Sequence, residues 1–296
     1  MQKVIFYFFI LKKVFLLFLY PFIPQKDGIF NKIRLNIENY LIFQPSKLRA
    51  VKIDRTLLKK FEPIRFITSD RRRLFAWYFK PQNDEKPVIL HLHGQAESVL
   101  SHQDVAKFCL KKGYGLLLLS YRGHYKSSGK ASEAGLRIDV QAAIDKLKEF
   151  GIDSKRLVLW GHSLGTVFAL YGALDNDVAG VILQSPIKEI KSSAININDF
   201  FLRRIHLKLF SIFTSKIIEG MNFISKLNNI ESISKVKVPI LLLHSKSDVI
   251  APCVNSEALH KVNPNSILNI SKTGSHWGIS WCVDSVFEFI ESLKYN

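Results

Sequence analysis

The chain has 296 residues, is 47% hydrophobic and carries a formal net charge of +17. This apolar content excludes an intrinsically disordered chain, and the length suits one large α/β domain with additions or two small domains. Three widely spaced cysteines, Cys109, Cys253 and Cys282, predict neither a disulfide framework nor a zinc site and favour a reducing compartment.

The positive charge is concentrated in two regions. Residues 1–73 contain 16 Lys and Arg against 5 Asp and Glu, and residues 187–238 contain 9 against 4. Such regions indicate attraction to an anionic surface. We favour membrane phospholipid over nucleic acid, because an apolar segment precedes the first basic region and the sequence contains no nucleic-acid-binding motif. A coding bias toward lysine is the alternative explanation for part of the excess.

Residues 4–23 are almost wholly apolar, apart from Lys12 and Lys13 in their middle. The run reaches the ~20 residues that span a bilayer, but two central lysines cost about 2.5 to 3.5 kcal/mol each. A strained single span, an interfacial anchor and a helix packed on the catalytic domain are the three interpretations. We predict a membrane anchor in residues 1–24, with the folded body on the cytoplasmic side because basic residues follow the segment. No small-residue cleavage site follows, which argues against a cleaved signal peptide.

The remainder divides into a basic, helical lead-in over residues 25–61 and a domain over residues 62–296. Residues 64–69 and 74–79 predict a β-hairpin. Continuous apolar strands are expected at 88–93, 115–121, 157–160, 179–185 and 238–244, and a short one at 267–270. Helices are expected at 98–112, 132–150, 254–262 and from 279 onward. This alternation predicts a mostly parallel, eight-stranded type of sheet with helices on both faces.

Residues 187–237 interrupt the alternation and show no core-strand pattern. Two amphipathic helices are expected around 200–202 and 207–218, with Arg203, Arg204 and Lys208 among them. We predict a small helical lid here, which suits an acyl or lipid-like substrate. Helices that only pad the domain are the alternative.

The segment Gly161-His162-Ser163-Leu164-Gly165 lies between a strand pattern and a helix pattern. This is the context of a Gly-x-Ser-x-Gly nucleophile elbow. Ser163 is therefore the candidate nucleophile, and Gly161 and Gly165 let strand and helix pass closely. His162 is expected to have a structural role beside it.

A serine nucleophile needs a base and an orienting carboxylate, which follow it along the chain in this fold. Asp248 lies in the segment Ser245-Lys-Ser-Asp248 that follows the apolar run 240–244, and His276 comes after the short strand at 267–270. We predict Asp248 as the acid and His276 as the base; His244 and His260 are weaker candidates. The oxyanion hole is expected from the backbone amides of Leu164 and Gln95, with Ala96 in reserve.

Several segments together resemble the α/β-hydrolase superfamily over residues 62–294. They are Leu41-Ile-Phe-Gln-Pro, His93-Gly94, Tyr121-Arg122-Gly123, Ser127-Ser-Gly129, Ala134-Gly135-Leu136 with Asp139, Gly161–Gly165, Gln184-Ser-Pro186 and His244 with Asp248. Together with the apolar N-terminal segment, they are similar to the membrane-anchored branch of abhydrolase-domain, serine-aminopeptidase-like proteins, which resembles lysophospholipases and acyl-protein thioesterases. That resemblance implies an α/β-hydrolase fold and a nucleophile, acid and base at Ser163, Asp248 and His276. Two positions depart from the family pattern, Gln95 in place of Asn and Ser275 in place of Gly.

These observations predict a serine hydrolase that cleaves carboxylic ester or thioester bonds of small acyl or lipid-like substrates near a membrane, without a metal or other cofactor. An aminopeptidase of the proline-iminopeptidase kind is the alternative enzyme, although its acidic amine pocket fits poorly with a basic lid. A catalytically silent, membrane-anchored scaffold on the same fold is the non-enzymatic alternative.

Overall fold

The computed structural model describes residues 12, 15–16, 19–24, 28–43, 54–204, 208–220 and 226–295. The chain divides into two compact units. The helical unit consists of Met1–Gln44 and Glu189–Leu227, and the sheet unit consists of Pro45–Lys188 and Asn228–Asn296. The predicted insertion at 187–237 thus contributes mainly to the helical unit, which also contains the N-terminal residues.

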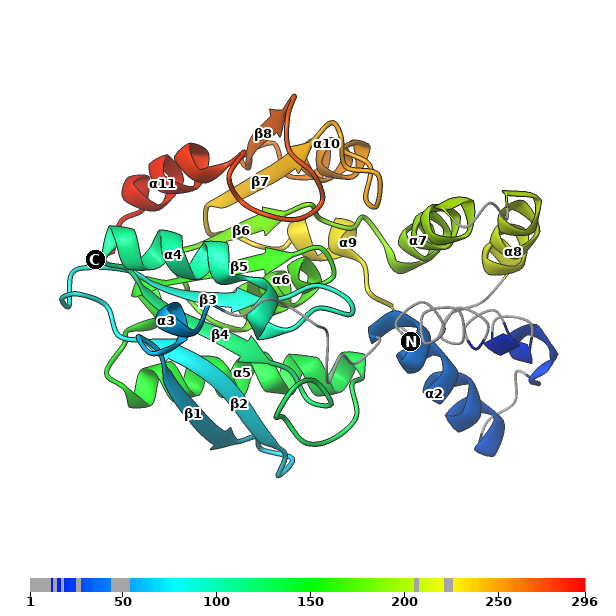
Figure 1. Cartoon of the computed structure of the whole chain (residues 1–296), viewed down its shortest axis with the longest axis horizontal. Coiled ribbons are helices and arrows are strands. Elements are labelled where there is room, and N and C mark those ends of the chain that lie inside the picture. The colour runs from blue at the N-terminus through cyan, green and yellow to red at the C-terminus, as the bar shows by residue number, and fades with distance from the viewer. Residues whose placement is uncertain are drawn as a thin grey trace. The chain divides into compact units, whose positions relative to one another are not determined.

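The sheet unit is built on one eight-stranded sheet (Figure 1). Its strands are β1 (Glu62–Ile67), β2 (Arg73–Phe79), β3 (Val88–Leu92), β4 (Gly115–Ser120), β5 (Leu157–His162), β6 (Gly180–Gln184), β7 (Ile240–Ser245) and β8 (Ile267–Ser271). Their spatial order is β1-β2-β4-β3-β5-β6-β7-β8. β1 pairs antiparallel with β2, and β2 with β4, whereas the remaining pairs are parallel. The mostly parallel sheet predicted from the sequence is confirmed.

The order of the strands positions the candidate site. The chain leaves β3 for β4 on one side and then crosses to β5 on the other side. Loops at the carboxyl ends of β3 and β5 therefore diverge, and such a switch point is where ligands bind in open α/β sheets. Ser163 directly follows β5, and the loop of His93 and Gly94 directly follows β3.

Helices of the sheet unit cover both faces of the sheet. They are α3 (Arg55–Leu58), η2 (Val99–Ser101), α4 (Gln103–Lys112), α5 (Glu133–Glu149), η3 (Ser154–Arg156), α6 (Gly165–Asp175), α9 (Asn229–Ile233), α10 (Val254–Val262) and α11 (Val283–Ser292). Val158 and Trp160 of β5 share a buried cluster with α4 and α11. Leu159 points to the opposite face, where it contacts Gly172 of α6.

Two of the predicted helices differ in their bounds from the helices in the structure. The helix expected over 98–112 is split, because His102 leaves the helical conformation at φ −107° and ψ 42° and its ring contacts Glu97. The helix expected from residue 279 begins at Val283, after a turn closed by a hydrogen bond from Cys282 N to Ile279 O. The short helix α9 was not predicted; the Asn228 side chain caps it.

A buried ion-pair group connects β4, α5 and the β1–β2 turn. The Arg122 side chain donates to Asp139 Oδ1 at 2.8 Å and to Asp70 Oδ2 at 2.7 Å. Its backbone N–H donates to Asp139 Oδ2 at 2.7 Å. Arg122 and Asp139 are both buried, so their charges are stabilised by each other rather than by water.

The helical unit contains η1 (Tyr20–Phe22), α2 (Ile29–Phe43), α7 (Ile190–Arg204) and α8 (Lys208–Gly220). Tyr20 and Ile218 form its small buried cluster, with Ile37, Leu41, Ala194 and Ile195 packed against them. Tyr20 and α2 therefore share one core with α7 and α8 of the insertion.

Helix α2 has an unusual distribution of side chains. Its polar residues Arg34 and Glu38 are buried, and both bond the Tyr20 hydroxyl. Its apolar residues Ile29, Phe30 and Ile33 are exposed. A water-facing helix normally shows the reverse pattern.

The predicted anchor at residues 4–23 falls mostly outside the described residues. Among those that are described, none of the helices combines the length and the apolar character that crossing a bilayer requires.

Candidate active site

The turn after β5 has the strained geometry that a nucleophile elbow requires. Ser163 has a φ of +52°, which L-residues seldom adopt. A Cβ atom on Gly161 would lie 2.6 Å from the Gly165 carbonyl oxygen, and one on Gly165 would clash with the Leu92 carbonyl. Both predicted glycines are thus required by the close passage of β3, β5 and α6. The turn is held by a 2.9 Å hydrogen bond from Ser163 N to Gln184 O.

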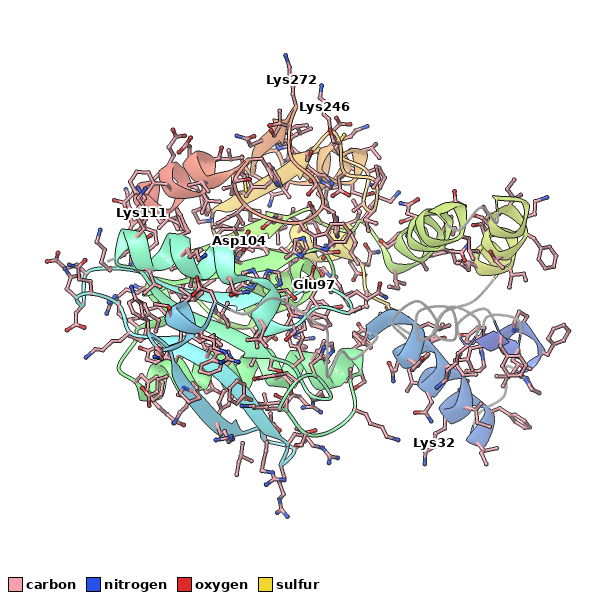
Figure 2. All side chains as sticks on the ribbon, in the orientation of Figure 1. Lys32, Glu97, Asp104, Lys111, Lys246 and Lys272 are labelled. Carbon is pink, nitrogen blue, oxygen red and sulfur yellow. The ribbon has the colours of Figure 1, made fainter. Side chains whose placement is uncertain are left out.

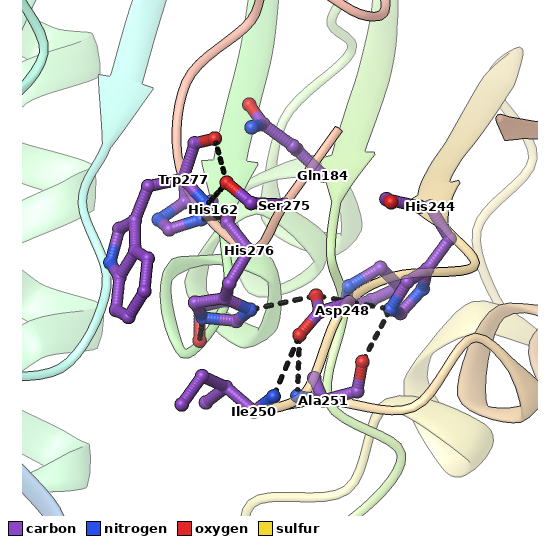
Figure 3. Close-up of polar contacts among 12 residues, drawn as sticks. His162, Gln184, His244, Asp248, Ile250, Ala251, Ser275, His276 and Trp277 are labelled. Carbon is purple, nitrogen blue, oxygen red and sulfur yellow. Dashed lines mark hydrogen bonds and ion pairs between the residues drawn. The ribbon is translucent and has the colours of Figure 1, made fainter. Parts of the chain in front are cut away.

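Ser163, His276 and Asp248 lie together at the carboxyl ends of β5, β8 and β7. His276 Nε2 is 3.1 Å from Ser163 Oγ, and His276 Nδ1 is 2.8 Å from Asp248 Oδ2. Figure 3 shows the imidazole of His276 directed toward the Asp248 carboxylate. All three residues are buried. The structure therefore brings together the three residues predicted as nucleophile, base and acid.

The Asp248 carboxylate is held from several directions. Its Oδ1 accepts the backbone N–H groups of Ile250 and Ala251, both at 2.9 Å. Its Oδ2 lies 3.4 Å from His244 Nε2, on the side away from His276 (Figure 3). Burial disfavours the charged carboxylate, but the contacts from His244, His276 and Ala251 outweigh it and hold the pKa of Asp248 well below its usual range.

His276 is suited to accept a proton at neutral pH. Burial lowers its pKa below that of an ordinary histidine, and the hydrogen bond to Asp248 opposes this shift only in part. The charge of His162, whose ring centroid is 5.0 Å away, also lowers the pKa of His276. The imidazole is therefore neutral at pH 7, as a general base must be.

The loop that carries His276 is held by two buried side chains. The ring of His162 bonds the His276 carbonyl oxygen through Nε2 at 2.7 Å, and Gln184 Nε2 donates to Gly278 O at 2.8 Å. Gln184 also accepts from Trp160 Nε1 at 3.1 Å. His162 thus has a positioning contact, which agrees with the structural role expected from the sequence.

The loop after β3 lies beside the nucleophile. A Cβ on Gly94 would be 3.1 Å from Ser163 Cβ, so the backbone here passes directly over the serine. The Gly94 N–H is already engaged, because it donates to Glu97 Oε2 at 2.6 Å. Gln95 follows, and Ala96 has a φ of +55°. Leu164, the second predicted donor, precedes the first residue of α6. The oxyanion-hole roles of Gln95 and Leu164 stay a prediction.

Glu97, His102 and His162 form a second buried cluster next to this loop. The three side chains each offer one atom of a metal-ligand type, and these atoms lie within 4.8 Å of one another. His102 Nε2 and His162 Nδ1 each lie 3.0 Å from Glu97 Oε2, however, which is hydrogen-bonding distance. The carboxylate therefore serves as the common acceptor of both rings.

Sequence reasoning missed Glu97, and it named His244 only as a weaker candidate for the base rather than as a contact of Asp248. His244 lies four residues before Asp248, a spacing that could have suggested contact across the turn after β7. Glu97 lies three residues after Gly94, which is the spacing of a side chain that accepts from a preceding backbone amide. Neither spacing is specific enough to assign a role without the fold.

Comparisons with known proteins agree with this architecture. The structure is similar to that of an esterase of Pyrococcus furiosus, Pf2001, with a TM-score of 0.70 and 20% sequence identity over 85% of this chain and 98% of that chain. Together with the eight-stranded sheet, this similarity shows that the chain has the α/β-hydrolase fold, and it confirms the fold class predicted from the sequence.

Sequence comparisons indicate which α/β-hydrolases the chain is similar to. Residues 83–225 match the family model described as serine aminopeptidase, S33. YfhR of Escherichia coli O157:H7 is 28% identical over 214 residues, which cover 68% of each protein. Lysophosphatidylserine lipase ABHD12 of Danio rerio is 30% identical over 183 residues, which cover 60% of this chain and 47% of that protein. The chain thus has the α/β-hydrolase fold and is similar in sequence to hydrolases of the abhydrolase-domain branch.

Proposed function

We propose that the protein is a serine hydrolase that cleaves carboxylic ester or thioester bonds of small acyl or lipid-like substrates. The observation that carries the proposal is the continuous hydrogen-bonded series from Ser163 through His276 to Asp248. The similarity to an esterase and to a lipase supports the same bond class.

Ser163 attacks the acyl carbonyl, and His276 Nε2 accepts the proton of its hydroxyl. Asp248 bonds Nδ1, which fixes the tautomer with a free Nε2 and stabilises the imidazolium that forms. The backbone amides of Leu164 and Gln95 hold the oxyanion, and each such donor is worth about 2.7 to 4 kcal/mol in the transition state. His276 then returns the proton to the leaving alcohol or thiol. Water, activated by the same imidazole, hydrolyses the acyl-enzyme and releases the acid.

The proposal is tested by labelling the full chain with a fluorophosphonate probe and by measuring hydrolysis of short p-nitrophenyl esters and acyl thioesters. Parent protein should be labelled, and Ser163→Ala should lose both the label and about 10⁴-fold or more of the activity. Ser185→Ala is the matched control, because Ser185 is also buried and has a positive φ but follows β6. If Ser163→Ala hydrolysed the esters as fast as the parent, the mechanism would be wrong.

An aminopeptidase is the second candidate, because the matching family model is described as a serine aminopeptidase. The same three residues would perform that reaction. A free α-amine would need an acidic partner near Ser163, and the buried carboxylates there, Asp248 and Glu97, are already engaged by histidines. Rates on aminoacyl p-nitroanilides relative to acyl esters distinguish the two, and a silent scaffold would show neither rate nor label.

We also propose that the helical unit associates with anionic membranes, with the sheet unit on the cytoplasmic side. The support is the exposed apolar face of α2 together with Phe22, whose side chain is 83% exposed. Lys32 projects from the same helix (Figure 2), as expected of a basic residue at a lipid headgroup.

A further inference from the structure

The Glu97 carboxylate collects hydrogen bonds from three parts of the sheet unit. Its Oε2 accepts from Gly94 N at 2.6 Å, and it lies 3.0 Å from both His102 Nε2 and His162 Nδ1. Glu97 is only 3% exposed, so water does not replace these partners. A carboxylate buried this deeply remains charged only where donors surround it. Burial raises the pKa of Glu97, but the contacts with His162 and His102 outweigh burial and hold that pKa well below its usual range.

His162 faces an acceptor at each of its two ring nitrogens. Nδ1 is 3.0 Å from Glu97 Oε2, and Nε2 is 2.7 Å from the His276 carbonyl oxygen. A carboxylate and a carbonyl oxygen can only accept, so each nitrogen must carry a proton to form its bond. The neutral imidazole has one such proton. With Glu97 ionised, these two contacts therefore require an imidazolium at His162.

We propose that Glu97 and His162 form a charged positioning pair for the reaction. The pair ties the loop after β3, the nucleophile elbow and the loop of His276 to one another. This inference rests on the proposed function, because the elements that the pair connects are those that would hold the oxyanion, the nucleophile and the base.

The contacts explain why all three elements depend on one pair. Glu97 fixes the amide of Gly94, which precedes Gln95, and so sets the direction of the loop above Ser163. His162 is the residue before Ser163, and its ring forms a hydrogen bond with the backbone carbonyl of His276 rather than with the His276 ring. The imidazole of His276 thus stays free to exchange protons with Ser163 while its main chain is held.

Three neighbouring histidines, His91, His93 and His276, do not compete with His162 for the proton. Burial lowers the pKa of His91 and of His93 well below the ordinary value, so both are neutral. Burial also lowers the pKa of His276. By contrast, the charge of Glu97 outweighs burial at His162 and raises the pKa of that ring.

The first test measures the protonation of the two ring nitrogens of His162 directly, and it does not depend on enzymatic turnover. Full-length protein labelled with ¹⁵N-histidine is studied by NMR at pH 7 to 8, and the His162 signals are assigned by their loss in His162→Gln. Both ring nitrogens should be protonated in the parent, whereas Glu97→Gln should leave one protonated. A neutral His162 in the parent at pH 7, or stoichiometric zinc bound to the trio of Glu97, His102 and His162, overturns the proposal.

The second test measures kcat per fluorophosphonate-titrated active site for Glu97→Gln, His162→Gln and the double variant. Each single variant should lose about 10- to 100-fold in kcat with little change in KM, as expected of misplaced groups. The kcat of the double variant should be no lower than the kcat of the less active single variant, because the two residues act as a unit. Glu133→Gln is the control, since Glu133 accepts from Tyr171 away from this site and should keep parent activity.

The outcomes separate the two proposals. A parent protein that neither labels nor hydrolyses esters contradicts the proposed function, while the NMR result still decides the charge of His162. An active parent with an equally active Glu97→Gln variant, per labelled site, contradicts the positioning role alone. A variant that only unfolds more easily loses labelled sites but keeps its kcat per site, which also contradicts the role.

Discussion

The two units of this chain use buried charge in different ways. In the sheet unit, Asp248 and Glu97 are each enclosed by donors that converge beside Ser163. In the helical unit, Arg34 and Glu38 are buried around the Tyr20 hydroxyl, while Ile29 of the same helix, α2, is 68% exposed.

The difference teaches that burial of charge has two separate purposes here. In the sheet unit it fixes side chains for chemistry inside an ordinary apolar core. In the helical unit, the buried side of α2 carries the charged residues, so the exposed side carries apolar residues. Exposure of several apolar side chains to water is unfavourable. We propose a division between the two units, in which the sheet unit carries out the reaction and the helical unit provides the surface that contacts lipid. Changes in the first should alter turnover, and changes in the second should alter binding to lipid.

The largest expected effect comes from Asp248→Asn. An amide cannot hold the His276 tautomer as a carboxylate does, so kcat should fall about 10⁴-fold. The fall should be equal for a soluble ester and for an ester in vesicles, because only the sheet unit is altered. Asp153→Asn is the control; Asp153 caps η3 on the surface and should retain full activity. A loss seen only with vesicle substrate contradicts the division.

Next comes Arg122→Met, which leaves the carboxylate of Asp139 buried without its partner. Removing one member of such a pair should lower the free energy of unfolding by about 3–5 kcal/mol. Arg137→Met is the control, because Arg137 and Asp175 form an exposed pair worth about 0–1 kcal/mol. Urea unfolding is followed by tryptophan fluorescence, since Trp77, Trp160, Trp277 and Trp281 all belong to the sheet unit. Equal losses in the two variants contradict the prediction.

Much of the sheet unit is predictable from its sequence. β3 to β7 are continuous apolar runs, and such runs are typical of parallel strands buried on both faces. The elbow is identified by glycines that a close passage requires, and Asp248 and His276 follow strands in the order the fold imposes. These features are either local patterns or a fixed order of residues along the chain, so they can be recognised from the sequence alone.

Other features depend on contacts between distant residues. Nothing in residues 20–43 indicates that Tyr20 shares a core with Ile218. The loop carboxylate of Glu97 similarly gives no sign of which of the nine histidines it meets. The burial of the polar side of α2 cannot be predicted from the sequence either. Periodicity shows that one side of the helix is apolar, but it does not show which side faces inward.

A smaller effect is expected from Ile29→Ser, which removes an apolar side chain from the exposed side of α2. Binding to vesicles that contain phosphatidylglycerol should weaken about tenfold, because part of the transfer energy of one isoleucine is lost. Sedimentation with vesicles measures the change, and added salt should weaken parent binding as well.

Ile67→Ser is the matched control for that measurement. Ile67 is 67% exposed, close to the value for Ile29, but it lies on β1 of the sheet unit. Vesicle binding should be unchanged in this variant, and hydrolysis of a soluble ester should be unchanged in both. Equal weakening by the two substitutions, or none by Ile29→Ser, contradicts membrane contact through α2.

The smallest expected effect is a displacement of the pH profile. Only neutral His276 accepts the serine proton, so activity is present above its pKa and is lost as the pH falls through it. Burial and the charge of His162 lower that pKa, which places the midpoint of the acid limb below the ordinary value of 6.5. His162→Gln should move the midpoint upward, because a neighbouring positive charge is removed. Profiles of kcat/KM on a soluble ester measure both midpoints, and vesicles should leave them unchanged. A parent midpoint above 6.5, or a downward movement in His162→Gln, would show that the electrostatics of the sheet unit do not keep His276 neutral.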